Sequence, residues 1–180
     1  MSLTTTKLDQ LNKHLDALFE QLSACTHQQL NSHPKPDSWS AIQVMHHLIL
    51  AESYSMRYCE KKLKNTTQFT NSGVATYVRS LLLRWYLLSG LKAKAPPRVN
   101  TDNLPDSDSL DYVMEQWLEQ RQKLRVWLEK ILPDYLDKAI YKHPIAGHLT
   151  IPGMLDFFEA HFRHHIPQIS KAARINIVLP

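Results

Sequence analysis

The sequence predicts an all-α protein: a four-helix bundle that forms one domain over residues 1–180, with a long crossover and an additional short helix. Long segments place apolar residues at three- and four-residue steps, which is the spacing of one buried helix face. No segment of length alternates polar and apolar residues in the way a strand does. A chain of 180 residues, of which 43% are hydrophobic, can bury a single core of this kind.

Two helices are predicted in the N-terminal part of the chain. The first covers about residues 4–31 and ends before Pro34, because proline cannot continue a helix. Its apolar stripe is formed by Leu8, Leu11, Leu15, Leu18, Phe19 and Leu22. The second runs from about Trp39 to Lys64, and Asp37-Ser38 offers an N-terminal cap for it. Its stripe is formed by Ile42, Met45, Ile49, Met56 and Leu63.

The long crossover covers residues 71–107. Within it, residues 74–93 are rich in leucine and predict a third helix, which ends before Pro96-Pro97. Residues 98–107 are polar and predict a linker. The connection between the second and fourth helices is therefore longer than in a simple up-and-down bundle.

Two more helices are predicted in the C-terminal half. A cap in Ser107-Asp108-Ser109 starts one helix, which Pro133 ends. Residues 134–149 are expected to be irregular because they contain helix-breaking proline and glycine. Thr150 is the expected cap of the last helix, which extends to about Ala173.

Composition argues against several classes of protein. Two cysteines, Cys25 and Cys59, are too few for a disulfide framework and lack metal-site spacing. The N-terminus does not have the pattern of a secretory signal peptide. The longest apolar stretch, Leu81 to Leu91, is interrupted by Arg84 and is too short to cross a bilayer. We therefore expect a cytoplasmic protein without a membrane segment.

The charge distribution bears on nucleic-acid binding. The net charge is +4, and the chain from Arg57 to Arg98 carries nine basic residues against one acidic residue. Such a stretch can attract nucleic acid, but it is more often a solvated helix face. Because aromatic and basic residues do not interleave here, we expect no nucleic-acid partner.

The histidines are the most informative residues. All ten fall into two groups, residues 14–47 and 143–165. His161 and His165 are four residues apart on the last predicted helix, so their side chains lie one turn apart on one face. That face is the apolar stripe of Met154, Phe158 and Ile169. A divalent ion would remove the desolvation penalty of two buried imidazoles, so we expect a metal site here.

A third ligand should come from a facing helix. The second predicted helix supplies His46-His47, and of these two residues His47 lies with Val44, Leu48 and Ala51. His46 points about 100° away from that face. The second helix therefore offers two histidines on different faces as candidates for the third ligand.

Two motifs carry a resemblance to a known family. The first is Trp39-Ser40, then Gln43-Val44-Met45-His46-His47-Leu48 and Glu52. The second is His143-Pro144, Gly147 and Thr150, followed by His161, His164-His165 and Gln168-Ile169. In this order the motifs resemble those of the DinB/YfiT-like superfamily, and the helical pattern matches over nearly the whole chain.

The resemblance implies a four-helix bundle that binds a divalent ion through His47, His161 and His165, the positions that match the motifs. The ion implied is nickel or zinc, while manganese and iron also accept imidazole ligands. Family members of known activity are similar to thiol-dependent transferases or isomerases, and many are dimers. The implied partners are therefore a small-molecule thiol, an electrophilic substrate and a second copy of the chain.

Three neutral imidazoles leave the charge of an ion uncompensated and leave coordination positions open. An ion held in this way would lower the pKa of a thiol or a water bound to it. The leading hypothesis is therefore a metal-dependent enzyme that transfers a low-molecular-weight thiol to a small electrophile. The alternatives are a metal-dependent hydrolase that uses water and a non-catalytic bundle in which the metal stabilises a dimer.

Glu52 and Arg121 each have a functional and a structural interpretation. Glu52 lies on the stripe of Ile49 and Met56, where it could orient a ligand imidazole, act as a general base, or pair with a basic residue. Arg121 interrupts the apolar stripe of its helix. It could bind an anionic substrate, although an ion-paired arginine is more common.

Four further polar residues lie within the range of the second motif. His164 is a candidate lining residue of the site, and Gln168, one turn away from it, is a candidate hydrogen-bonding residue. His143 and His148 flank the turn at Pro144 to Gly147, and we interpret them as loop composition.

Overall fold

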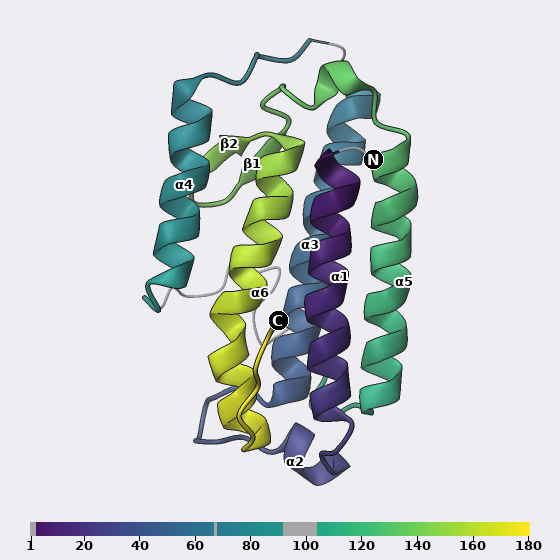
Figure 1. The fold of residues 1–180 in the computed structure, drawn as a ribbon, viewed down its shortest axis with the longest axis vertical. Coiled ribbons are helices and arrows are strands. Elements are labelled where there is room, and N and C mark those ends of the chain that lie inside the picture. Colours follow the sequence, from purple (N-terminus) through teal and green to yellow (C-terminus); the bar gives the residue numbers. More distant parts are fainter. Residues whose placement is uncertain (1–2, 67, 92–103) are drawn as a thin grey trace.

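The computed structural model describes residues 3–66, 68–91 and 104–180 and shows an all-α fold, as predicted (Figure 1). The bundle is formed by four long helices that lie side by side. They are α1 (Leu3–Leu22), α3 (Ala41–Asn65), α5 (Leu110–Glu129) and α6 (Ile151–Ala173). Each of the four packs on two of the others: α1 contacts α5 and α6, and α3 also contacts α5 and α6. Their apolar stripes meet in a core around Trp117 and Phe162, whose ring centroids are 5.9 Å apart.

The first predicted helix was too long. The prediction covered residues 4–31, but α1 ends at Leu22 and a separate short helix, α2, covers His27–Asn31. The new helix starts at a capping box, in which the Thr26 hydroxyl accepts from the Gln29 amide and the Gln29 side chain accepts from the Thr26 amide. These hydrogen bonds stabilise the start of a second helix. The apolar stripe alone predicts one continuous helix, because it does not show this start.

The third predicted helix, α4 (Val74–Leu88), lies outside the four-helix bundle. It packs against α6 and the adjoining hairpin, at one side of the molecule (Figure 1). The prediction extended it to residue 93, but it ends at Leu88, because Gly90 adopts a left-handed conformation with φ of +75°. The polar linker predicted over residues 98–107 lies partly outside the described residues.

Residues 134–149 are more ordered than predicted. They contain a short 3₁₀ helix, η3 (Pro133–Tyr135), and a hairpin of β1 (Tyr141–His143) and β2 (Gly147–Leu149). The strands pair antiparallel, with Tyr141 opposite Leu149. Gly147 takes φ of +78° in the turn between them. The hairpin lies between α3 and α4, with β1 against α3 and β2 against α4.

The two helices that carry the histidines begin at well-formed caps. The Ser40 side chain accepts from the Gln43 amide at the start of α3, and the Thr150 side chain accepts from the Gly153 amide at the start of α6. Pro167 lies inside α6, which continues beyond it to Ala173. Within the described residues, no helix is both long enough and apolar enough to cross a membrane.

Candidate metal centre

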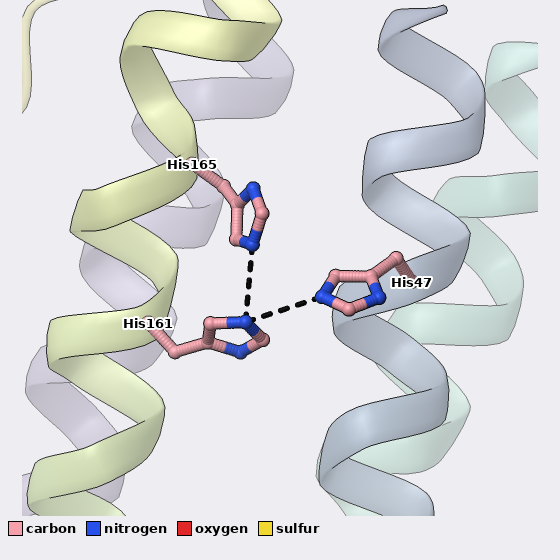
Figure 2. A group of neighbouring side chains, drawn as sticks. All are labelled: His47, His161 and His165. Atoms are coloured by element: carbon pink, nitrogen blue, oxygen red, sulfur yellow. Dashed lines mark hydrogen bonds between the residues drawn. The ribbon is translucent and has the colours of Figure 1, made fainter. Parts of the chain in front are cut away.

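His47, His161 and His165 converge between α3 and α6, as Figure 2 shows. The Nε2 atom of His161 lies 3.2 Å from Nε2 of His47 and 3.0 Å from Nε2 of His165. One candidate ligand atom from each residue can be chosen so that all three lie within 4.8 Å of one another. Among the histidine, cysteine and carboxylate side chains of the described residues, these three histidines form the group that could hold a metal ion.

The nitrogen separations fit a shared ion. Imidazole nitrogens bind zinc at about 2.0–2.1 Å, so two ligands of one ion lie about 2.9 Å apart at a right angle and about 3.3 Å apart at the tetrahedral angle. The separations of 3.0 and 3.2 Å from His161 fall within this range. The residues present therefore fit a transition-metal ion.

A hydrogen bond sets the tautomer of His165. Its Nδ1 atom lies 2.9 Å from the Oε1 atom of Gln168, and an amide oxygen accepts only from an N–H. Nδ1 therefore carries the proton of the neutral ring, and Nε2 presents its lone pair to His161. Metal-ligating histidines commonly have such a partner, which fixes the ring and raises its basicity. Gln168 thus lies where the sequence analysis expected a hydrogen-bonding residue.

Two of the three imidazoles are held neutral by the site. Burial, and then the neighbouring His47, lowers the pKa of His165 to about 3. Burial, followed by His165, His47 and other nearby imidazoles, holds the pKa of His161 well below its ordinary value. Protons therefore do not compete for the nitrogens of His161 and His165 at neutral pH, which favours binding of a cation.

The site is largely enclosed. His47 is 4% exposed and His165 is 8% exposed, whereas His161 is half-buried. An ion bound to these nitrogens would therefore be held by protein on most sides.

Aromatic rings surround the imidazoles. The ring of Trp39 lies 4.9 Å from that of His47, and the ring of Phe157 stacks on His161 with a centroid distance of 5.1 Å. Such rings exclude water from one side of the site and hold the imidazoles in place. The predicted stripe of the last helix included Phe158, but it is Phe157 that contacts His161.

His143 lies at the site, which its sequence context did not indicate. We interpreted it as loop composition, but it is buried on β1, and its ring lies 4.6 Å from that of Phe157 on the face of the site. Its Nδ1 atom accepts hydrogen bonds from the amides of Ile145 and Ala146, at 3.2 and 3.1 Å. The proton of the neutral ring is therefore on Nε2, and burial lowers the pKa to about 4. His148, by contrast, is exposed.

Glu52 and Arg121 form a buried ion pair. Nε of Arg121 donates to one carboxylate oxygen of Glu52 and Nη2 donates to the other, each at 2.7 Å. The indole N–H of Trp117 lies 3.4 Å from the same carboxylate. Of the interpretations left open for Glu52, the structure favours pairing with a basic residue.

Two other histidines of the motifs have separate partners. Nδ1 of His164 lies 2.6 Å from the carbonyl oxygen of Leu87, so it joins α6 to the end of α4. Its ring is 5.0 Å from that of His165, at the edge of the site. Nε2 of His46 lies 3.1 Å from a carboxylate oxygen of Asp108, away from the three convergent histidines, as its helix position predicted.

The comparisons with known proteins agree with this geometry. The DinB superfamily matches the chain over residues 8–169, so the chain belongs to this superfamily. The matched region covers α3 and α5 in full, most of α1 and α6, and the three convergent histidines. No curated protein and no solved structure gave a match.

Proposed function

We propose that this member of the DinB superfamily is a metal-dependent enzyme that transfers a low-molecular-weight thiol to a small electrophile. The observation that carries the proposal is the convergence of the imidazoles of His47, His161 and His165 on one point between α3 and α6. Nickel or zinc is the proposed ion, and manganese and iron also accept this donor set. We place the reaction in the cytoplasm, where small thiols stay reduced.

Different residues of the chain would bind the ion, orient its ligands and exclude water. His47, His161 and His165 would hold the ion, and the side-chain oxygen of Gln168 would keep His165 in its metal-binding tautomer. When bound, the ion would lower the pKa of an attached thiol and stabilise the thiolate at neutral pH. Trp39 and Phe157 would exclude water from the ligand side chains and provide an apolar surface for the electrophile.

The ease of deprotonation favours a thiol over water as the nucleophile. Free water is a far weaker acid than a free thiol, whose pKa is about 8.5. Among the described residues, the convergent group contains no carboxylate that could take this proton. The nearby candidate, Glu52, has both oxygens bonded to Arg121. The site is therefore better suited to the easier deprotonation.

Turnover assays test the proposal. Untagged protein would be loaded with nickel, zinc, manganese or iron and mixed with a chromogenic aryl halide or an epoxide. Cysteine, glutathione or other small thiols would be added in turn. We expect turnover that requires both ion and thiol and that is lost in His47→Phe. His46→Phe is the matched control, because His46 is adjacent on α3 but bonded to Asp108.

The outcomes separate the alternatives. Turnover that requires the ion but not the thiol would replace the proposal with a metal-dependent hydrolase. Metal-dependent stability without turnover of any thiol and electrophile pair would indicate a non-catalytic bundle. Equal activity in His47→Phe and His46→Phe would remove the three-histidine site from the reaction.

A further inference from the structure

One ring nitrogen of His143 is left without a hydrogen-bond partner among the described residues. Its Nδ1 atom accepts from the amides of Ile145 and Ala146, at 3.2 and 3.1 Å, so the proton of the neutral ring is on Nε2. Within the part of the chain that the structure describes, no acceptor bonds to this Nε2–H. His143 therefore presents a hydrogen-bond donor that the protein itself does not use.

The Nε2 atom of His143 is not sealed in the core. Among the described residues, the fully buried side-chain nitrogen or oxygen atom that has no hydrogen-bond partner is Nδ1 of His14. Nε2 of His143 has no partner either but does not belong with it, so a small part of its surface remains exposed, although the whole residue is only 7% exposed. This N–H thus stays open to a hydrogen-bonding partner from outside the chain.

His143 lies one aromatic ring away from a candidate metal ligand. Its ring centroid is 4.6 Å from that of Phe157, which in turn stacks on His161 with a centroid distance of 5.1 Å. His143 is also one of the neighbouring imidazoles that hold the pKa of His161 low. Because the amides of the turn hold Nδ1, Nε2 lies on the edge of the ring that faces away from the turn. The rings of His143, Phe157 and His161 thus form one contiguous group that carries an unused donor.

Two other donors beside the site are already bonded. The Ser55 hydroxyl lies 2.7 Å from the carbonyl oxygen of Ala51 and 3.0 Å from the Tyr141 hydroxyl. Because a carbonyl can only accept, the single proton of Ser55 goes to Ala51, and Tyr141 donates to Ser55. Nδ1 of His164 is bonded to a backbone carbonyl of α4. Of these three donors, the Nε2–H of His143 is the one that remains available to a substrate.

His143 is suited to bind a substrate and not a metal ion. Two amides occupy the lone pair of Nδ1, and Nε2 carries a proton, so neither nitrogen offers a lone pair to a cation. His143 also lies outside the group of three histidines whose nitrogens come within 4.8 Å of one another. A neutral imidazole that donates through an N–H can polarise an oxygen on which negative charge develops.

We propose that the Nε2–H of His143 binds the oxygen of an epoxide in the thiol transfer described above, so this inference rests on that proposed function. As the thiolate sulfur forms its bond to an epoxide carbon, the bond from this carbon to oxygen breaks, and its electron pair moves to the oxygen. Nε2–H donates a hydrogen bond to this oxygen. The oxygen then takes a proton from solvent in place of the one that the thiol released, and the product is a β-hydroxy thioether.

The surroundings of the donor favour an aryl epoxide over a halide. Negative charge that develops on an oxygen gains more from an N–H donor than charge that leaves on a halide, because a halide is the weaker acceptor. The ring centroids of Tyr141 and Phe157 lie 6.2 and 4.6 Å from that of His143. These two rings form an apolar border beside the donor, against which an aryl group can pack.

Steady-state kinetics test the proposal, with styrene oxide as the epoxide and benzyl chloride as a halide of similar size. His143→Asn keeps an oxygen that accepts from the turn amides but ends short of the position of Nε2. With styrene oxide, kcat should fall roughly 100-fold at nearly constant KM, because the donor acts on charge that develops in the transition state. With benzyl chloride, kcat should change little. His148→Asn, on the exposed face of the same hairpin, is the matched control.

Two further measurements isolate the donor. Metal content and circular dichroism should be equal in the wild type and in both asparagine variants. His143→Gln should recover part of the rate with styrene oxide, because its longer amide can place an N–H near the position of Nε2. Nitrogen NMR of zinc-loaded protein labelled at histidine should show a protonated Nε2 in His143.

The outcomes distinguish this inference from the proposed function. A wild type without turnover of any thiol and electrophile would contradict the proposed function and this inference with it. Turnover of styrene oxide by the wild type with an equal kcat in His143→Asn would overturn this inference alone. So would an equal loss with benzyl chloride, a change confined to the KM of the thiol, or an Nε2 that carries no proton.

Discussion

Two buried polar clusters share helix α3 and differ in whether they contain opposite charges. At Glu52, the carboxylate meets the guanidinium of Arg121 in two hydrogen bonds of 2.7 Å, so charge and hydrogen-bonding capacity balance within the protein. At His47, five residues earlier, three imidazoles converge through Nε2 atoms, and no opposite charge belongs to the group among the described residues. Both clusters lie in the interior of one bundle.

The difference separates a structural contact from a binding site. A buried ion pair with satisfied hydrogen bonds holds α3 against α5 and has little capacity left for a ligand. Three imidazoles whose Nε2 atoms converge form a set of nitrogen donors that a cation can bind. Variants in the first cluster should therefore change stability, while variants in the second should change metal binding.

The largest effect should come from breaking the ion pair. Arg121→Met leaves the Glu52 carboxylate buried without its partner, which should lower the free energy of unfolding by about 3–5 kcal/mol in a urea titration. The double variant Glu52→Leu with Arg121→Met should regain much of this loss, because it removes both charges. The metal content of folded Arg121→Met should not change. A folded variant that has lost its metal would instead show that Glu52 serves the histidines.

The next effect is a loss of metal affinity when the hydrogen bond from His165 to Gln168 is removed. Gln168→Met removes the oxygen that accepts from Nδ1 of His165, so we expect metal affinity to fall about 10- to 100-fold. Competition with a chromophoric chelator measures the affinity. Gln168→Glu keeps the acceptor and should bind the ion at least as well as the wild type. Equal affinity in Gln168→Met and the wild type would contradict the role of Gln168.

A smaller effect should appear as a pH dependence of stability in the metal-free protein. The pKa of His143 is lowered by burial from 6.5 to about 4. Between these values the unfolded chain binds a proton that the folded chain does not, so the stability present above pH 6.5 is lost as the pH falls. From pH 7 to pH 5 this single residue should remove about 2 kcal/mol.

His143→Asn isolates this contribution. The asparagine oxygen can still accept from the amides of the turn but does not titrate. Urea titrations at pH 7 and pH 5 should show that the variant loses about 2 kcal/mol less than the wild type between the two conditions. The other histidines contribute equally to both proteins, so an identical pH dependence would rule out a buried neutral His143.

Local patterns account for what the sequence predicted well. The separation of His161 and His165 by one helical turn follows from four residues of sequence, and their position on an apolar stripe indicates burial. The stripe of the second helix then separates His47 from His46. The structure places these two residues as predicted, with His47 at the site and His46 on Asp108.

Interactions between distant residues were harder to predict. Glu52 and Arg121 are 69 residues apart, so two interpretations of Glu52 stayed open until the packing of α3 on α5 was known. The hairpin was missed because each strand has three residues, too few to show alternation. Without the hairpin, nothing in the sequence placed His143 beside Phe157.

Metal content tests the central claim most directly. Protein purified without a histidine tag would be analysed by elemental mass spectrometry, as wild type and as His161→Ala. His164→Ala is the control, because it removes a neighbouring histidine that bonds to Leu87. We predict about one divalent ion per chain in the wild type and in His164→Ala, and none in His161→Ala, with the bundle still folded. A wild type that holds no ion and takes up neither zinc, nickel nor manganese would contradict the account, as would a His161→Ala variant that keeps its ion.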